Sequence, residues 1–204
     1  MPPPTIQRLP LYLRILDERA DQDRISSDEL GALAGVNAAK VRKDLSYLGS
    51  YGTRGVGYSV EQLRFEIRRS LGLTREWLLA IIGAGNLGSA LANYAGAHGE
   101  GYRVAGIFDA DPAKVGDRVG NVEVEPVERL GRAVRERGVD IGVIAVPPEA
   151  AQDVADLLAG AGVRSILNFA PTVVQVPDHV EVRRLDLGTE LRVLGYHLHR
   201  SQGP

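Results

Sequence analysis

The chain has 204 residues, of which 44% are hydrophobic and 25% charged, and its formal net charge is −2. This net charge excludes a general attraction to nucleic acids or membranes, so any DNA binding must come from a local basic patch. The chain has no cysteine, which excludes disulfides and cysteine zinc sites and fits a cytoplasmic location. No apolar run is long enough to span a membrane.

The N-terminal part of the sequence predicts four helices, of which the fourth follows a glycine-rich stretch and is capped by Ser59 and Gln62. Residues 5–20 form the first, in which Pro10 either causes a kink or marks the effective start. Ser26 has the position of an N-cap, and the helix after it is expected to stop near Gly35. Asn37 is the predicted cap of the third helix. Two short helices around a tight turn are typical of a helix-turn-helix unit.

The third predicted helix has an apolar face and a polar face. Helical spacing directs Val41 and Leu45 to the core, and the opposite face carries cations and hydroxyls beside the small Ala39. Such side chains suit guanine edges and phosphates. The stretch "GSYGTRGVGY" then predicts a glycine-rich β-wing, whose arginine suits a minor groove. The residues expected to contact DNA are Arg42, Lys43, Ser46, Tyr47, Ser50, Tyr51, Arg54 and Gly55.

The local charge agrees with DNA binding. Residues 38–75 contain eight basic and three acidic residues. The alternative is a small helical domain whose basic face is only solvated. The combination of two capped helices, a basic outer face and a Gly-Arg-Gly wing favours DNA binding over that alternative.

A glycine motif typical of dinucleotide sites follows a predicted buried strand over 76–82. Gly83 permits a tight turn, Gly85 lets the backbone approach a pyrophosphate, and Gly88 allows the following helix to pack closely on the strand. The pyrophosphate would meet the free N–H groups at the start of that helix. The cofactor-binding residues expected in this loop are Gly83, Ala84, Gly85, Asn86, Leu87 and Gly88.

A second predicted strand, over 102–109, ends in an acidic residue. Asp109 comes 21 residues after Gly88, where an acid that binds the adenosine ribose is expected. A residue that caps the next turn is the alternative, and Lys114 in that turn is a further candidate contact of the cofactor. Because Asp111 lies close by and no arginine follows Asp109, a 2′-phosphate would meet two carboxylates, which favours NAD over NADP.

Later strands complete an open, mostly parallel α/β sheet. They are predicted over 139–146 and 164–171, with a helix between them. Val146, Pro147 and Phe169 end these strands on the cofactor side. Contact with the nicotinamide ring and ordinary packing are equally compatible with each of the three.

The sequence lacks the residues that hydride-transfer catalysis requires. A dehydrogenase needs a substrate pocket and a positioned acid or base, and little chain remains after the sheet to form a substrate domain. The four histidines occupy places typical of surface or packing residues, and no metal-ligand spacing is present. Tyr94, on the helix after the glycine motif, is as compatible with facing a nicotinamide as with burial. A ligand sensor is favoured over an NAD-dependent oxidoreductase with an accessory helical domain and over a CoA- or nucleotide-binding module.

An apolar helical stripe follows the predicted sheet. It consists of Leu187, Leu191, Leu194 and Leu198. The helix either folds onto its own domain or packs on a second chain. The second arrangement is favoured because DNA readers of this type bind palindromic sites as symmetric dimers.

Five stretches of the sequence resemble one family. They are "RLPLYLRIL", "VRKDLSYLGSYGTRGVGY", "GAGNLGSALANY", "FDADPAKVG" and "ILNFAP", and they are similar to the Rex family of redox-sensing transcriptional repressors over essentially the whole chain. The resemblance implies a winged-helix DNA-binding domain over 1–76, a Rossmann NAD(H)-binding domain over 77–186, and a C-terminal helix and tail over 187–204. It also implies a homodimer that exchanges this helix and is not an enzyme. Such a repressor binds palindromic operators when NADH is low relative to NAD and releases them when NADH binds.

The same resemblance implies roles for individual residues. Arg14, Tyr94 and Asp186 match the residues of the family's redox-linked switch. Leu187 departs from the family pattern, which has phenylalanine near the nicotinamide, so the ring pocket is expected to differ. An apolar pocket penalises the cationic oxidised ring more than the neutral reduced ring, which makes selectivity for NADH physically reasonable.

Overall fold

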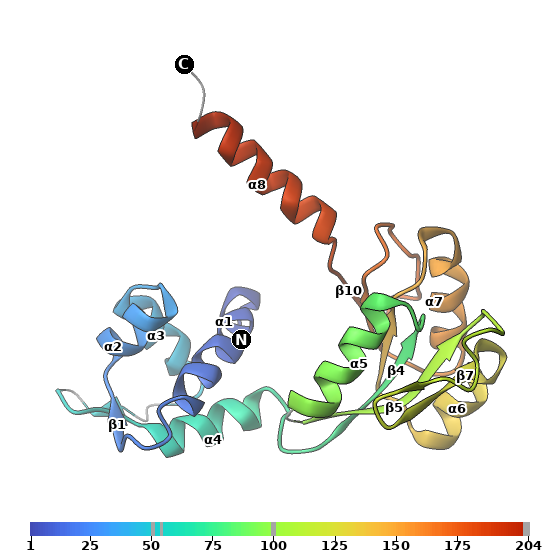
Figure 1. The fold of residues 1–204 in the computed structure, drawn as a ribbon. Coiled ribbons are helices and arrows are strands. Elements are labelled where there is room, and N and C mark those ends of the chain that lie inside the picture. The colour runs from blue at the N-terminus through green and yellow to red at the C-terminus, as the bar shows by residue number, and fades with distance from the viewer. Residues whose placement is uncertain (50–51, 54, 99–100, 202–204) are drawn as a thin grey trace. The chain divides into compact units, whose positions relative to one another are not determined.

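The computed structural model describes residues 1–49, 52–53, 55–98 and 101–201. The chain forms two compact units, an N-terminal unit over Met1–Arg75 and a C-terminal unit over Glu76–Pro204 (Figure 1). Among the described residues, no helix is both long enough and apolar enough to cross a membrane.

The N-terminal unit consists of helices and a small antiparallel sheet. Its helices are α1 (Pro3–Asp17), α2 (Ser27–Ala34), α3 (Ala38–Ser46) and α4 (Val60–Ser70), and its strands are β1 (Arg24–Ile25), β2 (Gly52–Thr53) and β3 (Gly57–Ser59). β3 lies between β1 and β2 and is antiparallel to both. α1 begins at Pro3 and passes through Pro10, so Pro10 does not mark its start. Proline suits the first turn of a helix, where its missing N–H is not needed.

Side-chain caps define where the short helices begin. Ser26, Asn37 and Ser59 each accept a hydrogen bond from the backbone N–H three residues later, at 3.0, 2.8 and 3.3 Å. α2 ends at Gly35, which has a left-handed φ of 67° that favours glycine. The predicted starts of the second and third helices are therefore confirmed. The helices enclose a core that includes Leu9, Tyr12, Leu16, Leu30, Val41, Leu45, Leu63 and Ile67.

The C-terminal unit is built on a seven-stranded sheet of the described residues. Its strands are β4 (Trp77–Ile82), β5 (Tyr102–Asp109), β6 (Arg118–Val119), β7 (Val122–Pro126), β8 (Ile141–Ile144), β9 (Ser165–Asn168) and β10 (Glu181–Arg184). The spatial order is β10-β9-β8-β4-β5-β7-β6, with β6 antiparallel to β7 and the other strands parallel. Without β6, this is the strand order 3-2-1-4-5-6 of the Rossmann fold. The predicted pairing of a helix-turn-helix unit with a parallel α/β sheet is confirmed.

The helices of the C-terminal unit cover the two faces of the sheet unequally (Figure 1). They are α5 (Asn86–His98), α6 (Leu130–Arg137), α7 (Ala151–Gly160) and α8 (Leu187–Ser201). Ile81 faces the core formed with α5, whereas Ala80 and Ile82 face the core formed with α6 and α7. Right-handed crossovers place helices on opposite faces on the two sides of the point where the strand order reverses. The α5 face of β8, β9 and β10 therefore receives no helix from the described part of this unit.

The last helix, α8, leaves its side chains exposed. Every residue over 187–200 is exposed, including the predicted stripe, whose first member, Leu187, is 61% exposed. α8 therefore does not bury this stripe on its own domain, which was one of the two arrangements open from the sequence.

Candidate functional site

α3 presents a basic, hydroxyl-rich face to solvent. Arg42, Lys43 and Ser46 on α3 are exposed, and so is Tyr47, which ends the helix. The Arg42 guanidinium donates a hydrogen bond of 3.0 Å to Ser27 Oγ on α2, which ties the two helices of the motif together. We call α3 the reading helix, because its exposed side chains are of the types that bind base edges and phosphates.

The β2–β3 hairpin follows the reading helix as a wing. Gly57 has a φ of 84°, and a Cβ there would lie 2.5 Å from the carbonyl oxygen of Ile25, so glycine is needed where β3 meets β1. Gly55 also has a positive φ, of 79°, and faces open space. Three of the predicted DNA contacts, Ser50, Tyr51 and Arg54, lie outside the described residues.

The three glycines of the motif after β4 meet different surroundings. Gly83 has a φ of 103°, and a Cβ there would lie 2.4 Å from the carbonyl oxygen of Ala145. A Cβ at Gly88 would lie 1.8 Å from the carbonyl oxygen of Gly83. At Gly85, no protein atom lies within 4 Å of the Cβ position. Gly83 and Gly88 are therefore required by the fold, whereas Gly85 leaves room for a group outside the chain.

Asp109 lies at the end of β5 and holds this loop. Its Oδ2 accepts hydrogen bonds from the backbone N–H of Ala84 at 2.7 Å and from Lys114 Nζ at 3.1 Å, and its Oδ1 accepts one from the backbone N–H of Asp111 at 2.9 Å. Burial raises the pKa of Asp109, but these hydrogen bonds and the charge of Lys114 outweigh burial and hold the pKa below its usual value. The turn cap, which was the alternative to ribose binding, is therefore present, and the carboxylate is ionised at neutral pH.

A polar cavity of about 330 Å³ lies beside Asp109. Its lining residues are Ala84, Ser89, Lys114, Asp117, Arg118, Val119 and Val124. Arg118 is brought here by the β6–β7 hairpin, which the sequence did not predict. The cavity is therefore lined by two cations, Lys114 and Arg118, and by one carboxylate, Asp117.

The carboxyl ends of β4, β5, β8 and β9 meet at the point where the strand order reverses, and in open α/β sheets this place is the ligand crevice. Gly83 N–H donates to the carbonyl of Phe108 at 2.7 Å, and Phe169 N–H donates to that of Ile144 at 2.9 Å. Val146 Cγ1 lies 3.2 Å from the Cβ position of Gly83, and Pro147 is exposed. Of the three predicted ring contacts, Val146 lies against the glycine loop, and Pro147 and Phe169 lie at the ends of the neighbouring strands β8 and β9.

Asn168, which the sequence did not single out, shapes this edge of the crevice. It is 1% exposed, its amide donates to the carbonyl of Thr172, and its Oδ1 accepts from Ala170 N–H, both at 2.9 Å. Because these bonds close the turn that contains Phe169, Asn168 fixes the path of the chain at the crevice.

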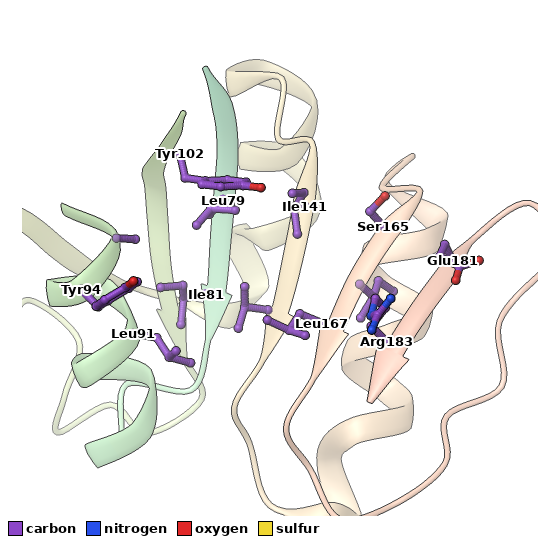
Figure 2. A pocket seen from close by; sticks show the side chains of 13 residues that line it. Leu79, Ile81, Leu91, Tyr94, Tyr102, Ile141, Ser165, Leu167, Glu181 and Arg183 are labelled. Atoms are coloured by element: carbon purple, nitrogen blue, oxygen red, sulfur yellow. The ribbon is translucent and has the colours of Figure 1, made fainter. Parts of the chain in front are cut away.

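An apolar groove of about 470 Å³ lies on the α5 face of the sheet (Figure 2). Leu91, Tyr94 and Ala95 of α5 form one wall, and Tyr94 is 65% exposed. Alternate residues of the strands line its floor, namely Leu79, Ile81, Ile141, Val143, Ser165, Leu167, Glu181 and Arg183. The groove occupies the part of the sheet that no described helix covers, and Tyr94 borders it.

The three predicted switch residues belong to different elements. Arg14 is exposed on α1 in the N-terminal unit, and Tyr94 lies on α5. Asp186 precedes α8 and caps it, accepting hydrogen bonds from Thr189 Oγ1 at 2.8 Å and Thr189 N–H at 3.1 Å. These bonds hold the pKa of Asp186 below its usual value. The described residues include no group of three or more His, Cys, Asp or Glu side chains arranged to hold a metal ion.

A winged helix-turn-helix unit joined to a Rossmann unit with an open glycine loop defines a class, the transcription regulators that respond to a small-molecule ligand. A family model described as "CoA binding domain" matches residues 74–172, and one described as "Putative DNA-binding protein N-terminus" matches residues 1–46.

Full-length relatives narrow the class. The chain is 55% identical to the redox-sensing transcriptional repressor Rex of Streptomyces griseus, over 100% of this chain and 81% of that protein. It is 47% identical to Rex of Carboxydothermus hydrogenoformans, over 98% of both chains. A crystal structure of RSP in complex with β-NAD⁺ and operator DNA has a TM-score of 0.93 at 39% identity and covers 99% of this chain and 94% of that one. A complex of RSP with β-NADH has a TM-score of 0.87 at 38% identity, over 99% and 96%. The chain belongs to the Rex family of redox-sensing transcriptional repressors and is a regulator, not an enzyme.

Proposed function

We propose that the protein represses transcription by binding palindromic operator DNA through its N-terminal unit, and that NADH binding to its C-terminal unit releases the DNA. The observation that carries this proposal is the presence, in one chain, of an exposed basic reading helix and a Rossmann crevice where Gly85 faces open space. The relatives with operator DNA, β-NAD⁺ and β-NADH support it. Acting on the chromosome places the protein in the cytoplasm.

Each part of the chain has a separate role in this proposal. Residues 1–76 bind DNA, with Arg42 and Lys43 on the reading helix and Arg54 in the wing as the main cationic contacts. Residues 77–186 bind NAD(H), with the pyrophosphate at the glycine loop, the adenosine ribose at Asp109 and the ring near Val146, Pro147 and Phe169. The ligand is bound and released without being consumed, because the chain belongs to a family of repressors and is not an enzyme.

The third part, residues 187–204, joins two copies of the chain. The leucine stripe of α8 is exposed, and the groove beside α5 is apolar and has no helix of the described chain over it. We propose that α8 of a second copy occupies this groove, because its leucine stripe is apolar like the groove. Each copy would place its α8 in the groove of the other, in a symmetric exchange. This also brings α8 of one copy to the wall of the groove where Tyr94 lies.

The switch follows from this arrangement. A hydrogen bond between Tyr94 and Asp186 in the NADH-bound state, and an ion pair between Arg14 and Asp186 in the DNA-bound state, would give the two states different contacts. A ligand shifts such an equilibrium only through its different affinities for the two states. The neutral reduced ring fits an apolar pocket at lower desolvation cost than the cationic oxidised ring.

An operator-release assay tests the proposal. The wild-type protein selects a palindromic duplex from a randomised pool, and the complex is then titrated in a gel-shift at fixed salt with NADH, NAD⁺ and CoA in parallel. We expect NADH to release the duplex at a concentration far below the NAD⁺ concentration that gives the same release. CoA is expected to have no effect. Equal release by CoA would indicate a CoA-binding module. Failure to select any duplex would contradict the proposed binding of palindromic operators.

A further inference from the structure

A buried carboxylate joins the reading helix to the first helix of the chain. Asp44 lies on α3 and is only 1% exposed, although aspartate is rarely buried without partners. Its partners are three side chains of α1, namely Thr5, Arg8 and Tyr12. These three are spaced three and four residues apart, so they share one face of α1.

The hydrogen bonds to Asp44 fill its acceptor positions. Oδ1 accepts from Thr5 Oγ1 at 2.8 Å and from Arg8 Nη2 at 2.7 Å. Oδ2 accepts from Arg8 Nε at 2.6 Å and from Tyr12 Oη at 2.8 Å. A carboxylate offers about four lone-pair sites, so each site has a donor. Burial disfavours the charged carboxylate, but the bonds from Arg8, Thr5 and Tyr12 outweigh burial and hold the pKa of Asp44 below its usual value.

This cluster fixes orientation more narrowly than the apolar core does. Apolar contacts are non-directional, so Val41 and Leu45 alone would allow α3 to slide or rotate against α1. The bidentate Arg8–Asp44 pair and the two hydroxyl bonds are directional. A shift of α3 along or about its axis would break several of these bonds at once.

The same helix that contacts Asp44 carries a switch residue. Arg14 follows Tyr12 by two residues on α1 and is exposed. Lys43 and Ser46 lie on the exposed side of α3, opposite the buried Asp44. A rigid connection through Asp44 therefore links an exposed position on α1 to the exposed side chains of the reading helix.

We propose that Asp44 is a positioning residue that makes α1 and α3 move as one body, so that a displacement of α1 at Arg14 reorients the reading helix. This inference rests on the proposed function for the roles of α3 and Arg14. Without Asp44, α3 would settle on DNA independently of α1, and NADH would lose most of its influence on operator binding.

The test compares operator binding with and without NADH. A labelled palindromic duplex selected by the wild-type protein is titrated by fluorescence anisotropy, and the Kd at saturating NADH is divided by the Kd without NADH. We expect Asp44→Asn to lower this ratio about fivefold or more, while its affinity for NADH stays that of the wild type. Tyr12→Phe, which removes one of the bonds, should lower the ratio less.

The matched control is Asp17→Asn, which alters a different ion-pair cluster of α1. Asp17 accepts from Arg64 at 2.6 Å and from Arg68 at 3.2 Å, so it joins α1 to α4 and not to the reading helix. For Asp17→Asn, the ratio of the Kd at saturating NADH to the Kd without NADH is expected to equal that of the wild type.

Two results would overturn the inference. One is a folded Asp44→Asn protein whose operator affinity falls by the same factor with and without NADH. The Kd ratio is then unchanged, which indicates only a general weakening of operator binding. If Asp44→Asn does not fold, as judged by circular dichroism, the deciding result is a folded Tyr12→Phe protein with an unchanged ratio. A wild-type ratio near one contradicts the proposed function instead, so the two failures are distinguishable.

Discussion

The backbone N–H of Ala84 donates a hydrogen bond of 2.7 Å to the carboxylate of Asp109, so the acid at the end of β5 holds the glycine loop that follows β4. The Asp111 N–H and the Lys114 ammonium donate to the same carboxylate. Since a carboxylate has about four lone-pair sites, one acceptor position remains for a ribose hydroxyl. Turn capping and ribose binding, the two interpretations open from the sequence, are therefore compatible with each other.

Asp109→Asn is expected to weaken NADH binding about tenfold or more, because it removes a charged acceptor and loosens the loop. Titration followed by the fluorescence of NADH measures this. Asp111→Asn is the control, because Asp111 accepts the N–H of Ala113 at 3.0 Å on the exposed side of the same turn. Equal losses in the two variants would contradict the ribose role.

Gly85→Ala and Gly88→Ala separate binding from folding within one loop. The methyl group of alanine at Gly85 would meet no protein atom within 4 Å. The free energy of unfolding, measured by thermal denaturation, should therefore change by no more than about 0.5 kcal/mol, while the affinity for NADH falls. Alanine at Gly88 would overlap the carbonyl oxygen of Gly83 and should cost at least about 1–3 kcal/mol of stability. A Gly85→Ala protein that binds NADH normally would show that the pyrophosphate lies elsewhere.

Lys43→Ala is expected to weaken operator binding and to reduce its salt dependence. If Lys43 contacts one phosphate, the plot of the logarithm of the operator-binding constant against the logarithm of the salt concentration should become less steep, its negative slope shrinking in magnitude by about 0.9. The control is Arg132→Ala, which removes an exposed cation of α6 that pairs with Glu136 at 2.6 Å in the other unit. An unchanged slope for Lys43→Ala would exclude that contact.

Leu191→Glu should prevent association of two copies, because it places a charge in the middle of the stripe, where Leu191 is 68% exposed in the single chain. Light scattering after size exclusion would then report the monomer mass, whereas Arg200→Ala, off the stripe, should leave the dimer intact. A dimeric Leu191→Glu protein would argue against α8 as the joining element.

Tyr12 makes a prediction for alkaline pH. Burial, together with the bond to Asp44 and its negative charge, raises the pKa of Tyr12 from 10.0 to about 12. A folded-state pKa above the unfolded value contributes stability that is fully present below about pH 10 and is lost as the pH rises toward 12. The urea midpoint of the wild type should therefore fall more steeply above pH 10 than that of Tyr12→Phe. Parallel curves would mean that the phenol titrates normally.

The elements with strong periodicity or capping signals could be predicted, and those that depend on distant partners could not. The glycine motif, β5 and the caps at Ser26 and Asn37 have local signals in the sequence. β10 is a short, polar edge strand of sequence "EVRR", and its place next to β9 depends on tertiary pairing. β7 and α6 were missed although their signals are local. The stretch "VEVE" in β7 alternates apolar and polar residues, and Leu130, Ala133 and Val134 of α6 have helical spacing.

The site shows the same division. The exposed side of α3 could be predicted because helical spacing separates it from Val41 and Leu45. The burial of Asp44 could not be predicted, because an aspartate in a basic helix gives no sign of hydrogen-bond partners that lie 32 to 39 residues earlier in the chain. The open α5 face of the sheet was also beyond prediction, since it depends on the side to which each crossover turns.

The bare groove has a consequence for how the protein depends on its own abundance. When the cover of an apolar surface comes from another copy of the chain, part of the free energy of folding is gained only on association, so stability depends on protein concentration. Dilution then exposes the groove and the α8 stripe together. A repressor whose two copies pair in the proposed way has a lower limit of copy number in the cell, below which it loses both its paired DNA-binding units and part of its stability.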